Sequence, residues 1–206
     1  MPGVINRDFF FSQVRNTVFG GKINKGQVDG STAILNYWEQ NYAKSDDRWL
    51  AYILGTAYHE TAHTMKPIEE FGGNAYFKSM YDIEGSRPQV ARSLGNLTPG
   101  DGVEYHGRGF VQVTGKRNYQ DWTNRINKPG VNLVNNPDKA LDTGVATVII
   151  VEGMVKGSFT GKKLSQYFSG TTANWTAARA IVNGSDRALM IGDYGQKFYA
   201  AISYTV

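Results

Sequence analysis

The chain has 206 residues, of which 41% are hydrophobic and 13% aromatic. This length and composition suit one compact domain or two closely joined lobes. Because the chain contains no cysteine, disulfides and Cys-ligated metal sites are excluded. The formal net charge of +4 favours an anionic polymer such as nucleic acid or a bacterial cell wall. Nucleic acid is not expected as a partner, because the basic residues are scattered and no nucleic-acid-binding motif occurs.

No apolar run approaches the ~18 residues needed to span a membrane. We therefore expect no stable membrane association. The stretch 1–21 contains an apolar triplet at positions 9–11, but charged residues at 7, 8 and 15 interrupt it. This stretch is not predicted to be a secretory signal. We expect a monomer that is made and held in a cytoplasm.

Helical spacing of apolar residues predicts three helices in the first third of the chain. They cover residues 8–19, about 30–42 and 46–63. Asp29 or Ser31 is expected to cap the second helix. Pro67 is expected to end the third, because proline disfavours helical geometry in the residue before it.

Residues 71–105 are rich in glycine and polar residues and lack periodicity, which predicts loops with one short hairpin. Helical spacing returns in four later segments, 118–126, 138–155, 175–182 and 194–202. The pattern as a whole predicts a mostly helical α+β fold with a small irregular β portion.

The pentapeptide His59-Glu60-Thr61-Ala62-His63 has two incompatible interpretations. On a helix, H-E-x-x-H places two imidazoles on one face for zinc, with the glutamate as general base. The H-E-T part can instead present Glu60 as the general acid of a glycoside hydrolase that needs no metal. A catalytic zinc requires a third protein ligand. Neither His106 nor Glu84 is a convincing one, which disfavours the zinc interpretation.

A second notable segment covers residues 105–119 and begins with two closely spaced glycines. Alternation over 110–114 predicts an extended strand with Gln112 and Thr114 on one face. Such side chains can hydrogen-bond to sugar hydroxyls, N-acetyl groups or a water. From spacing alone, a glycine turn whose polar residues face solvent is the simpler interpretation.

Three parts of the sequence, in this order, resemble glycoside hydrolase family 19, the family of chitinases and phage endolysins. They are His59-Glu60-Thr61, the segment 107–114 with Asn118-Tyr119, and Ile181-Val182-Asn183-Gly184. The stretch 9–39 is also similar to the N-terminal helices of short phage endolysins, so the resemblance covers most of the chain. It implies a lysozyme-like fold with a cleft between two lobes. It also implies inverting hydrolysis of a β-1,4 bond next to an N-acetylated sugar, without metal or cofactor.

The resemblance assigns roles to individual residues. Glu60 corresponds to the general acid, and Thr114 to the residue that positions the attacking water. Gln112, Asn118 and Asn183 correspond to polar residues that contact the substrate. Arg108 is assigned to substrate binding or, alternatively, to a structural ion pair with a cleft carboxylate.

The second carboxylate is Glu69 or Glu70, and the sequence leaves the choice open. In a continuous helix, an offset of nine residues would rise about 13.5 Å and turn to the opposite face. The chain must therefore bend, and Pro67 supplies a physical reason. An ungapped match to endolysins favours Glu69, whereas the local Pro-Ile-x-Glu-aromatic-Gly pattern favours Glu70. Three other acidic residues rank lower, namely Asp82, Glu84 and Glu104.

The basic charge and the absence of a secretory signal favour acidic peptidoglycan over neutral chitin as substrate. The chain is thus predicted to be a bacteriophage endolysin of the muramidase type. We expect a single catalytic domain over 1–206 without a wall-binding module. It would wait in the host cytoplasm until a separate factor releases it to the wall. The alternatives are a chitinase and a zinc-dependent peptidoglycan peptidase that uses His59 and His63.

Overall fold

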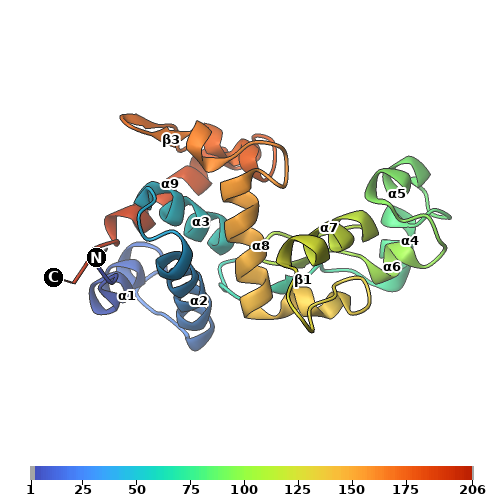
Figure 1. Cartoon of the computed structure of the whole chain (residues 1–206), viewed down its shortest axis with the longest axis horizontal. Coiled ribbons are helices and arrows are strands. Elements are labelled where there is room, and N and C mark those ends of the chain that lie inside the picture. Colours follow the sequence, from blue (N-terminus) through green and yellow to red (C-terminus); the bar gives the residue numbers. More distant parts are fainter. Residues whose placement is uncertain (1–2, 206) are drawn as a thin grey trace. The chain divides into compact units, whose positions relative to one another are not determined.

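The computed structural model describes residues 3–205 and confirms the mostly helical α+β fold (Figure 1). The chain divides into two compact units. Unit 1 comprises Met1–Lys66 and Thr147–Val206, and unit 2 comprises Pro67–Ala146. Within residues 3–205, no helix is both long and apolar enough to cross a membrane. A single catalytic domain over 1–206 stays a prediction.

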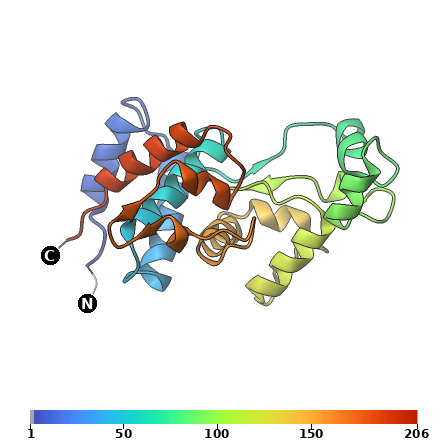
Figure 2. The same cartoon turned by 90° about the horizontal axis from the view of Figure 1, so that it is seen from above.

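Unit 1 is built around helix α3, Asp47–Glu60, in which nine consecutive residues from Leu50 to Tyr58 are buried. Helix α9 crosses α3 closely at two glycines (Figure 2). A Cβ on Gly55 would lie 2.8 Å from the backbone nitrogen of Gly195, so α3 cannot carry a larger residue there unless the helices move apart. A Cβ on Gly195 would lie 2.9 Å from the Trp175 ring. The other elements of this unit are α1 (Arg7–Thr17), α2 (Lys25–Asn41), most of α8 (Thr143–Lys156), η2 (Leu164–Gln166), β3 (Phe168–Ser169), β4 (Thr172–Ala173), η3 (Ala177–Ile181) and α9 (Ala188–Ala200).

Helix α2 begins earlier than the sequence predicts, at Lys25. Asn24 caps it by accepting a hydrogen bond from the Gln27 amide, and the Gln27 side chain accepts one from the Asn24 amide. This reciprocal capping box satisfies two amides that the first turn leaves unpaired. The expected cap at Asp29 or Ser31 is therefore wrong.

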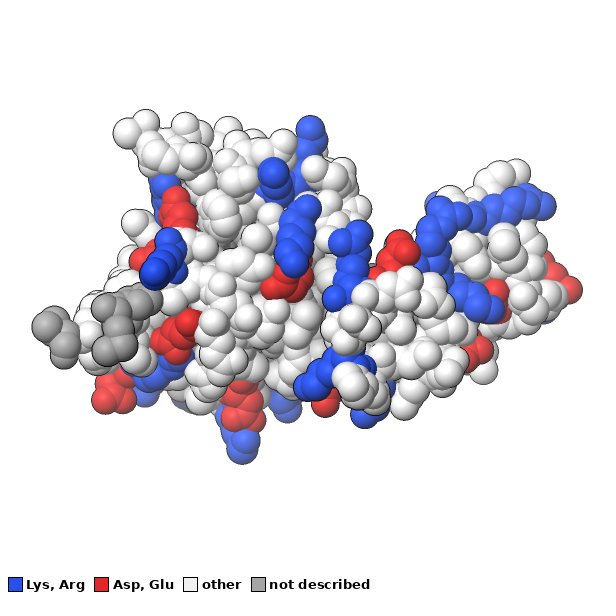
Figure 3. Space-filling view, viewed as in Figure 1, with Lys and Arg blue, Asp and Glu red and all other residues white. Residues whose placement is uncertain are grey.

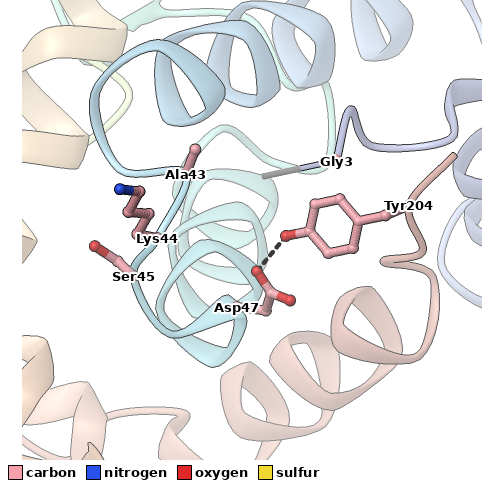
Figure 4. Close-up of a pocket in the computed structure, with 6 residues that line it drawn as sticks. All are labelled: Gly3, Ala43, Lys44, Ser45, Asp47 and Tyr204. Atoms are coloured by element: carbon pink, nitrogen blue, oxygen red, sulfur yellow. Dashed lines mark hydrogen bonds between the residues drawn. The ribbon is translucent and has the colours of Figure 1, made fainter. Parts of the chain in front are cut away.

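The two ends of the described chain pair with each other in unit 1. Ile5 and Tyr204 form an antiparallel bridge, and the Tyr204 hydroxyl donates a 2.5 Å hydrogen bond to Asp47 at the start of α3 (Figure 4). A shallow cavity of about 240 Å³ lies beside this bond. It is lined by Gly3, Ala43, Lys44, Ser45, Asp47 and Tyr204.

Unit 2 differs most from the sequence prediction. Residues 71–105 contain three short helices and no strand, so the hairpin expected there is wrong. The two-stranded sheet of this unit pairs a strand before this stretch with a strand after it. Helices this short show little hydrophobic periodicity, which is why the sequence predicted loops. The elements are β1 (Ile68–Glu69), α4 (Asn74–Tyr81), α5 (Pro88–Leu94), α6 (Asp101–Glu104), β2 (Arg108–Gly109), α7 (Lys116–Ile126) and η1 (Pro137–Leu141).

Buried Asp82 holds this helical stretch together. Its carboxylate accepts hydrogen bonds from the amides of Glu84, Gly100 and Gly102, at 3.1, 2.8 and 3.1 Å. Burial by itself would raise the pKa of Asp82, but these hydrogen bonds outweigh burial and hold the pKa below its usual value of 3.8. Asp82 thus has a structural role here, in keeping with its low rank as a catalytic candidate.

Asp82→Asn should lower the free energy of unfolding at neutral pH by roughly 1–3 kcal/mol, because an amide nitrogen, which donates and cannot accept, replaces one carboxylate oxygen. The folded-state pKa lies below the unfolded value. The stabilisation by Asp82 is therefore present above about pH 4 and is lost as the pH falls through the folded pKa. Urea unfolding at pH 7 and pH 3 measures both effects. The matched control is Asp121→Asn on the exposed face of α7, and equal stability of the two variants at pH 7 would contradict this role.

Candidate active site

Glu60 is the last residue of α3, and a buried hydroxyl ends the helix directly after it. The Thr61 hydroxyl donates to the Ala57 carbonyl at 2.7 Å and accepts from the Met65 amide at 3.0 Å. The Ala57 carbonyl also accepts a hydrogen bond from the Thr61 backbone amide at 3.1 Å, so the hydroxyl adds a second hydrogen bond there and closes a tight turn. The helix ends seven positions before Pro67, so the expected continuation to His63 is wrong.

The turn after Glu60 is held against helix α2. Three of its residues adopt left-handed backbone conformations, Ala62, His63 and Met65, with φ of 48°, 69° and 55°. Gln27 donates to the His63 carbonyl at 3.0 Å. A Cβ on Gly30 would lie 1.7 Å from the Met65 carbonyl oxygen, so a side chain at position 30 would push the turn away. Contacts distant in sequence therefore determine where α3 ends.

The Glu60 carboxylate pairs with Arg179, a residue of η3 that is 3% exposed. The distance between Glu60 Oε1 and Arg179 Nη1 is 2.5 Å, and Arg179 Nε donates to the Asp186 carbonyl at 3.1 Å. A helix C-terminus carries a partial negative charge, which is unfavourable for a carboxylate, and the guanidinium compensates for it. Arg179 thus fixes the direction of the Glu60 side chain, which remains 20% exposed.

In unit 1 the predicted Glu60 thus pairs with the unpredicted Arg179, and the predicted Asn183 lies four residues after Arg179. Asn183 is exposed just beyond η3, and its backbone amide donates to the Arg179 carbonyl at 3.0 Å. Sequence reasoning missed Arg179, because a single arginine in a predicted helix carries no pattern. Its position four residues before Asn183, in a stretch otherwise poor in charge, is the signal that was available.

The two histidines of the pentapeptide do not form a zinc-binding pair on one helical face, because α3 ends between them. His63 is exposed and stacks on Tyr58 with ring centroids 4.3 Å apart. Burial lowers the pKa of His59, and its Nδ1 has no hydrogen-bond partner among the described residues. In the described part of the chain, no group of three or more His, Asp or Glu residues is arranged to hold a metal ion.

In unit 2, the short β1–β2 ladder places the two candidate carboxylates differently. Glu69 lies opposite Arg108 in the register. The Glu70 amide donates to the Gly107 carbonyl at 2.8 Å, and the Gly107 amide returns a 3.0 Å hydrogen bond to Glu70 Oε2. Successive side chains of a strand point to opposite faces, so the ladder separates Glu69 from Glu70.

Glu70 shares its face with the two polar residues of the 105–119 segment. A Cβ placed on Gly107 would lie 2.9 Å from both Glu70 Oε2 and Gln112 Oε1, and 3.2 Å from Thr114 Oγ1. Three oxygen atoms therefore converge beside this glycine. On its other side the Glu70 carboxylate accepts a 2.7 Å hydrogen bond from Tyr81. Burial and this hydrogen bond raise the pKa of Tyr81, so the hydroxyl stays a donor.

The strand expected over 110–114 is wrong, because residues 110–112 form a tight turn closed by a bridge between Arg108 and Val113. Gln112 sits in this turn with φ of 54°. Its amide nitrogen donates to the carbonyls of Ile68 and Gly109 at 3.0 and 3.1 Å, which ties β1 to the turn. The side-chain oxygen of Gln112 is left facing Gly107. The turn, not strand alternation, brings Gln112 and Thr114 together.

Thr114 and Asn118 follow this turn. The Thr114 hydroxyl donates to the Gln112 carbonyl at 2.9 Å. Exposed Asn118, in the first turn of α7, donates to the Thr114 carbonyl at 2.7 Å. Both side chains are thereby oriented by the same short segment.

Glu69 belongs to a different network, built around His106. Glu69 Oε1 lies 2.7 Å from His106 Nε2, and His106 Nδ1 lies 2.6 Å from the Val103 carbonyl oxygen. Because a carbonyl only accepts, Nδ1 is the nitrogen that carries a hydrogen and donates it to Val103. The imidazole stacks on Phe77 with centroids 4.1 Å apart. His106 is thus fully occupied and is not free to bind zinc.

Arg108 completes the network and is 6% exposed. It donates to Asp138 and to the Glu104 carbonyl, both at 2.9 Å, and its Nη2 lies 3.7 Å from Glu69. Arg108 thus forms ion pairs of the kind that the sequence analysis gave as the alternative to substrate binding. Asp138 and His106 are partners that sequence reasoning did not assign.

No protein-family model and no curated protein sequence matches the chain. Solved structures do match it over nearly its full length. A bacterial family 19 chitinase is 20% identical with a TM-score of 0.56, and the match covers 98% of this chain and 96% of that one. Chitinase C from Streptomyces griseus is 20% identical with a TM-score of 0.51, and the match covers 95% of this chain and 89% of that one. A class IV family GH19 chitinase from Zea mays is 19% identical with a TM-score of 0.54, and the match covers 94% of this chain and 90% of that one. The chain therefore has the fold of family 19 chitinases, and the expected lysozyme-like architecture is confirmed.

Proposed function

We propose that the chain is a glycoside hydrolase that cleaves β-1,4 bonds next to N-acetylated sugars with inversion. One observation carries the proposal. On a fold shared with family 19 chitinases, Glu60 ends a buried helix and is held by a buried arginine. A carboxyl group that is partly withdrawn from water and rigidly aimed is suited to proton transfer.

In the proposed reaction, Glu60 donates its proton to the glycosidic oxygen as the bond from that oxygen to the anomeric carbon breaks. A water attacks the anomeric carbon from the opposite face and gives its proton to the second carboxylate. Inversion follows because a single displacement occurs. Arg179 acts as a positioning residue, since it contacts Glu60. Asn183 is assigned to substrate contact in the same unit.

We assign Glu70 as the second carboxylate. It lies beside the same glycine as Thr114, so a water there could be held by both side chains. Glu69 is 53% exposed, but one of its oxygens is engaged by His106 and approached by Arg108. Glu70 also accepts hydrogen bonds, from Tyr81 and from the Gly107 amide, so it is the face shared with Thr114 that favours Glu70 over Glu69. Gln112 and Asn118 are assigned to substrate contact, and Arg108 to positioning through its network.

Peptidoglycan is the substrate that we propose, in the role of a bacteriophage endolysin. The net charge of +4 favours a polymer that carries acidic groups. Figure 3 shows Lys and Arg side chains on the surface of each unit taken by itself, interspersed with Asp and Glu. Chitin is the second candidate, favoured by the likeness to chitinases. Release of reducing ends from purified sacculi and from chitin oligomers, compared at equal enzyme concentration, separates the two.

Glu60→Gln should keep the fold and lose about 10²–10⁴-fold in turnover, because the amide has no transferable proton. His63→Ala, three residues later, is the matched control and should retain most activity, since His63 is exposed. Reducing-end release from sacculi measures both. A Glu60→Gln protein that keeps most of its rate would refute the assignment of the acid.

Glu70→Gln should reduce kcat strongly with little change in substrate binding, whereas Glu69→Gln should be milder. Thr114→Val removes the hydroxyl at nearly constant volume and should also lower kcat more than it raises KM. The first product should be the α-anomer, seen by NMR before mutarotation. If Glu69→Gln is the more damaging variant, the assignment of the two carboxylates is reversed.

Activity should be independent of metal, since the geometry of α3 separates His59 from His63. Exhaustive chelation should leave lysis of sacculi unchanged, and the products should carry new reducing ends. Loss of activity on chelation that zinc alone restores, together with new free amines, would instead establish the peptidase alternative.

A further inference from the structure

Phe71 is the most exposed large hydrophobic side chain in the described part of the chain, with a relative exposure of 101%. It directly follows Glu70, the carboxylate assigned above as the base. Burial of a phenylalanine side chain normally lowers the free energy, because it removes apolar surface from water. A ring that touches nothing beside a candidate catalytic group therefore has an unused contact surface.

The backbone on both sides of Phe71 is held in place. On one side, Glu70 is fixed by hydrogen bonds to Gly107 and Tyr81. On the other side, a Cβ on Gly72 would lie 2.6 Å from Tyr76 Cδ1 and 2.8 Å from Phe77 Cε1. The backbone at Gly72 thus lies directly against two rings, which are themselves packed edge to face with centroids 5.6 Å apart.

The backbone contacts on both sides of Phe71 hold its ring outside the packed surface of unit 2. At Gly72, the residue after Phe71, the rings of Tyr76 and Phe77 already cover the backbone. Because the backbone on both sides is already held, a ligand that binds the ring has only the Phe71 side chain to order.

The chemistry of the ring selects the ligand. Phenylalanine offers no hydrogen bond, so it recognises an apolar surface rather than hydroxyl groups. Each β-1,4-linked pyranose has a face made of axial C–H groups that an aromatic ring can cover, and its hydroxyls remain free for polar partners. The half-exposed Tyr76, on the adjoining helix α4, and the Glu70 carboxylate supply polar groups on either side of Phe71 in the sequence.

We propose that Phe71 is a stacking platform for an N-acetylated pyranose ring of the polysaccharide chain. It would secure the sugar adjacent to Glu70 and so contribute to substrate affinity. The inference rests on the proposed function, because it takes its ligand from the polymer that the enzyme cleaves.

The test compares Phe71→Ala with Phe71→Tyr, which restores the ring, and with Leu97→Ala, a matched truncation of another exposed apolar residue of unit 2 (65% exposed). Binding of N-acetylglucosamine tetramer is measured by calorimetry in the Glu60→Gln background. Reducing-end kinetics on solubilised peptidoglycan glycan strands are measured with active Glu60. Thermal unfolding checks that each variant is folded.

Phe71→Ala should weaken tetramer binding and raise KM by roughly ten- to a hundredfold, in line with loss of one stacked aromatic side chain. Its kcat should change less than about threefold. Phe71→Tyr and Leu97→Ala should behave like the parent protein.

Parental binding and kinetics of Phe71→Ala would overturn the proposal. So would a loss of kcat at unchanged KM, because Phe71 would then act on Glu70 rather than on the sugar. Sedimentation with phosphatidylglycerol–phosphatidylethanolamine vesicles tests a lipid ligand, and Phe71-dependent vesicle binding with unchanged sugar binding would also overturn it. If the parent protein releases no reducing ends yet binds the tetramer through Phe71, the glycosidase function fails and the platform stands.

Discussion

The turn that follows Glu60 is the constraint on which unit 1 depends. The Thr61 hydroxyl closes it, the bare backbone of Gly30 on α2 makes room for it, and Gln27 ties it down. The result is a carboxylate at the end of a helix whose preceding residues are buried on every side. Since that position is electrostatically unfavourable for a negative charge, the buried guanidinium of Arg179 becomes necessary. The H-E-T motif thus combines a candidate catalytic residue, Glu60, with a residue that ends the helix, Thr61.

In unit 2, each residue of the segment Gly107-Arg108-Gly109 likewise has a structural explanation. Gly107 leaves the space on which the oxygens of Glu70, Gln112 and Thr114 converge. Arg108 points into the interior and joins Glu69 to Asp138 and to backbone carbonyls. Gly109 has φ of 96°, a conformation that disfavours any other residue. Two glycines and one buried arginine therefore separate a face available to substrate from a network that maintains the loop.

The two candidate carboxylates of the proposed reaction occupy different surroundings. Glu60 is held by a full positive charge, whereas Glu70 is held by neutral donors, the Tyr81 hydroxyl and the Gly107 amide. Inverting hydrolysis requires one carboxyl group to give a proton and the other to accept one. The exposed ring of Phe71 adds an apolar surface next to the second of them.

The sequence by itself determined the helices with long apolar stripes, including α1, α3 and α7, and the mostly helical fold. It also singled out Glu60, because the order of three short motifs resembles one enzyme family. Only the tertiary structure decided that α3 ends at Glu60, that Arg179 is its partner, and that Glu70 rather than Glu69 faces Thr114. The reason is physical. Helix periodicity is local, whereas a helix stop, a buried ion pair and a strand register depend on residues distant in the chain, and a shift of one residue in a strand exchanges its faces.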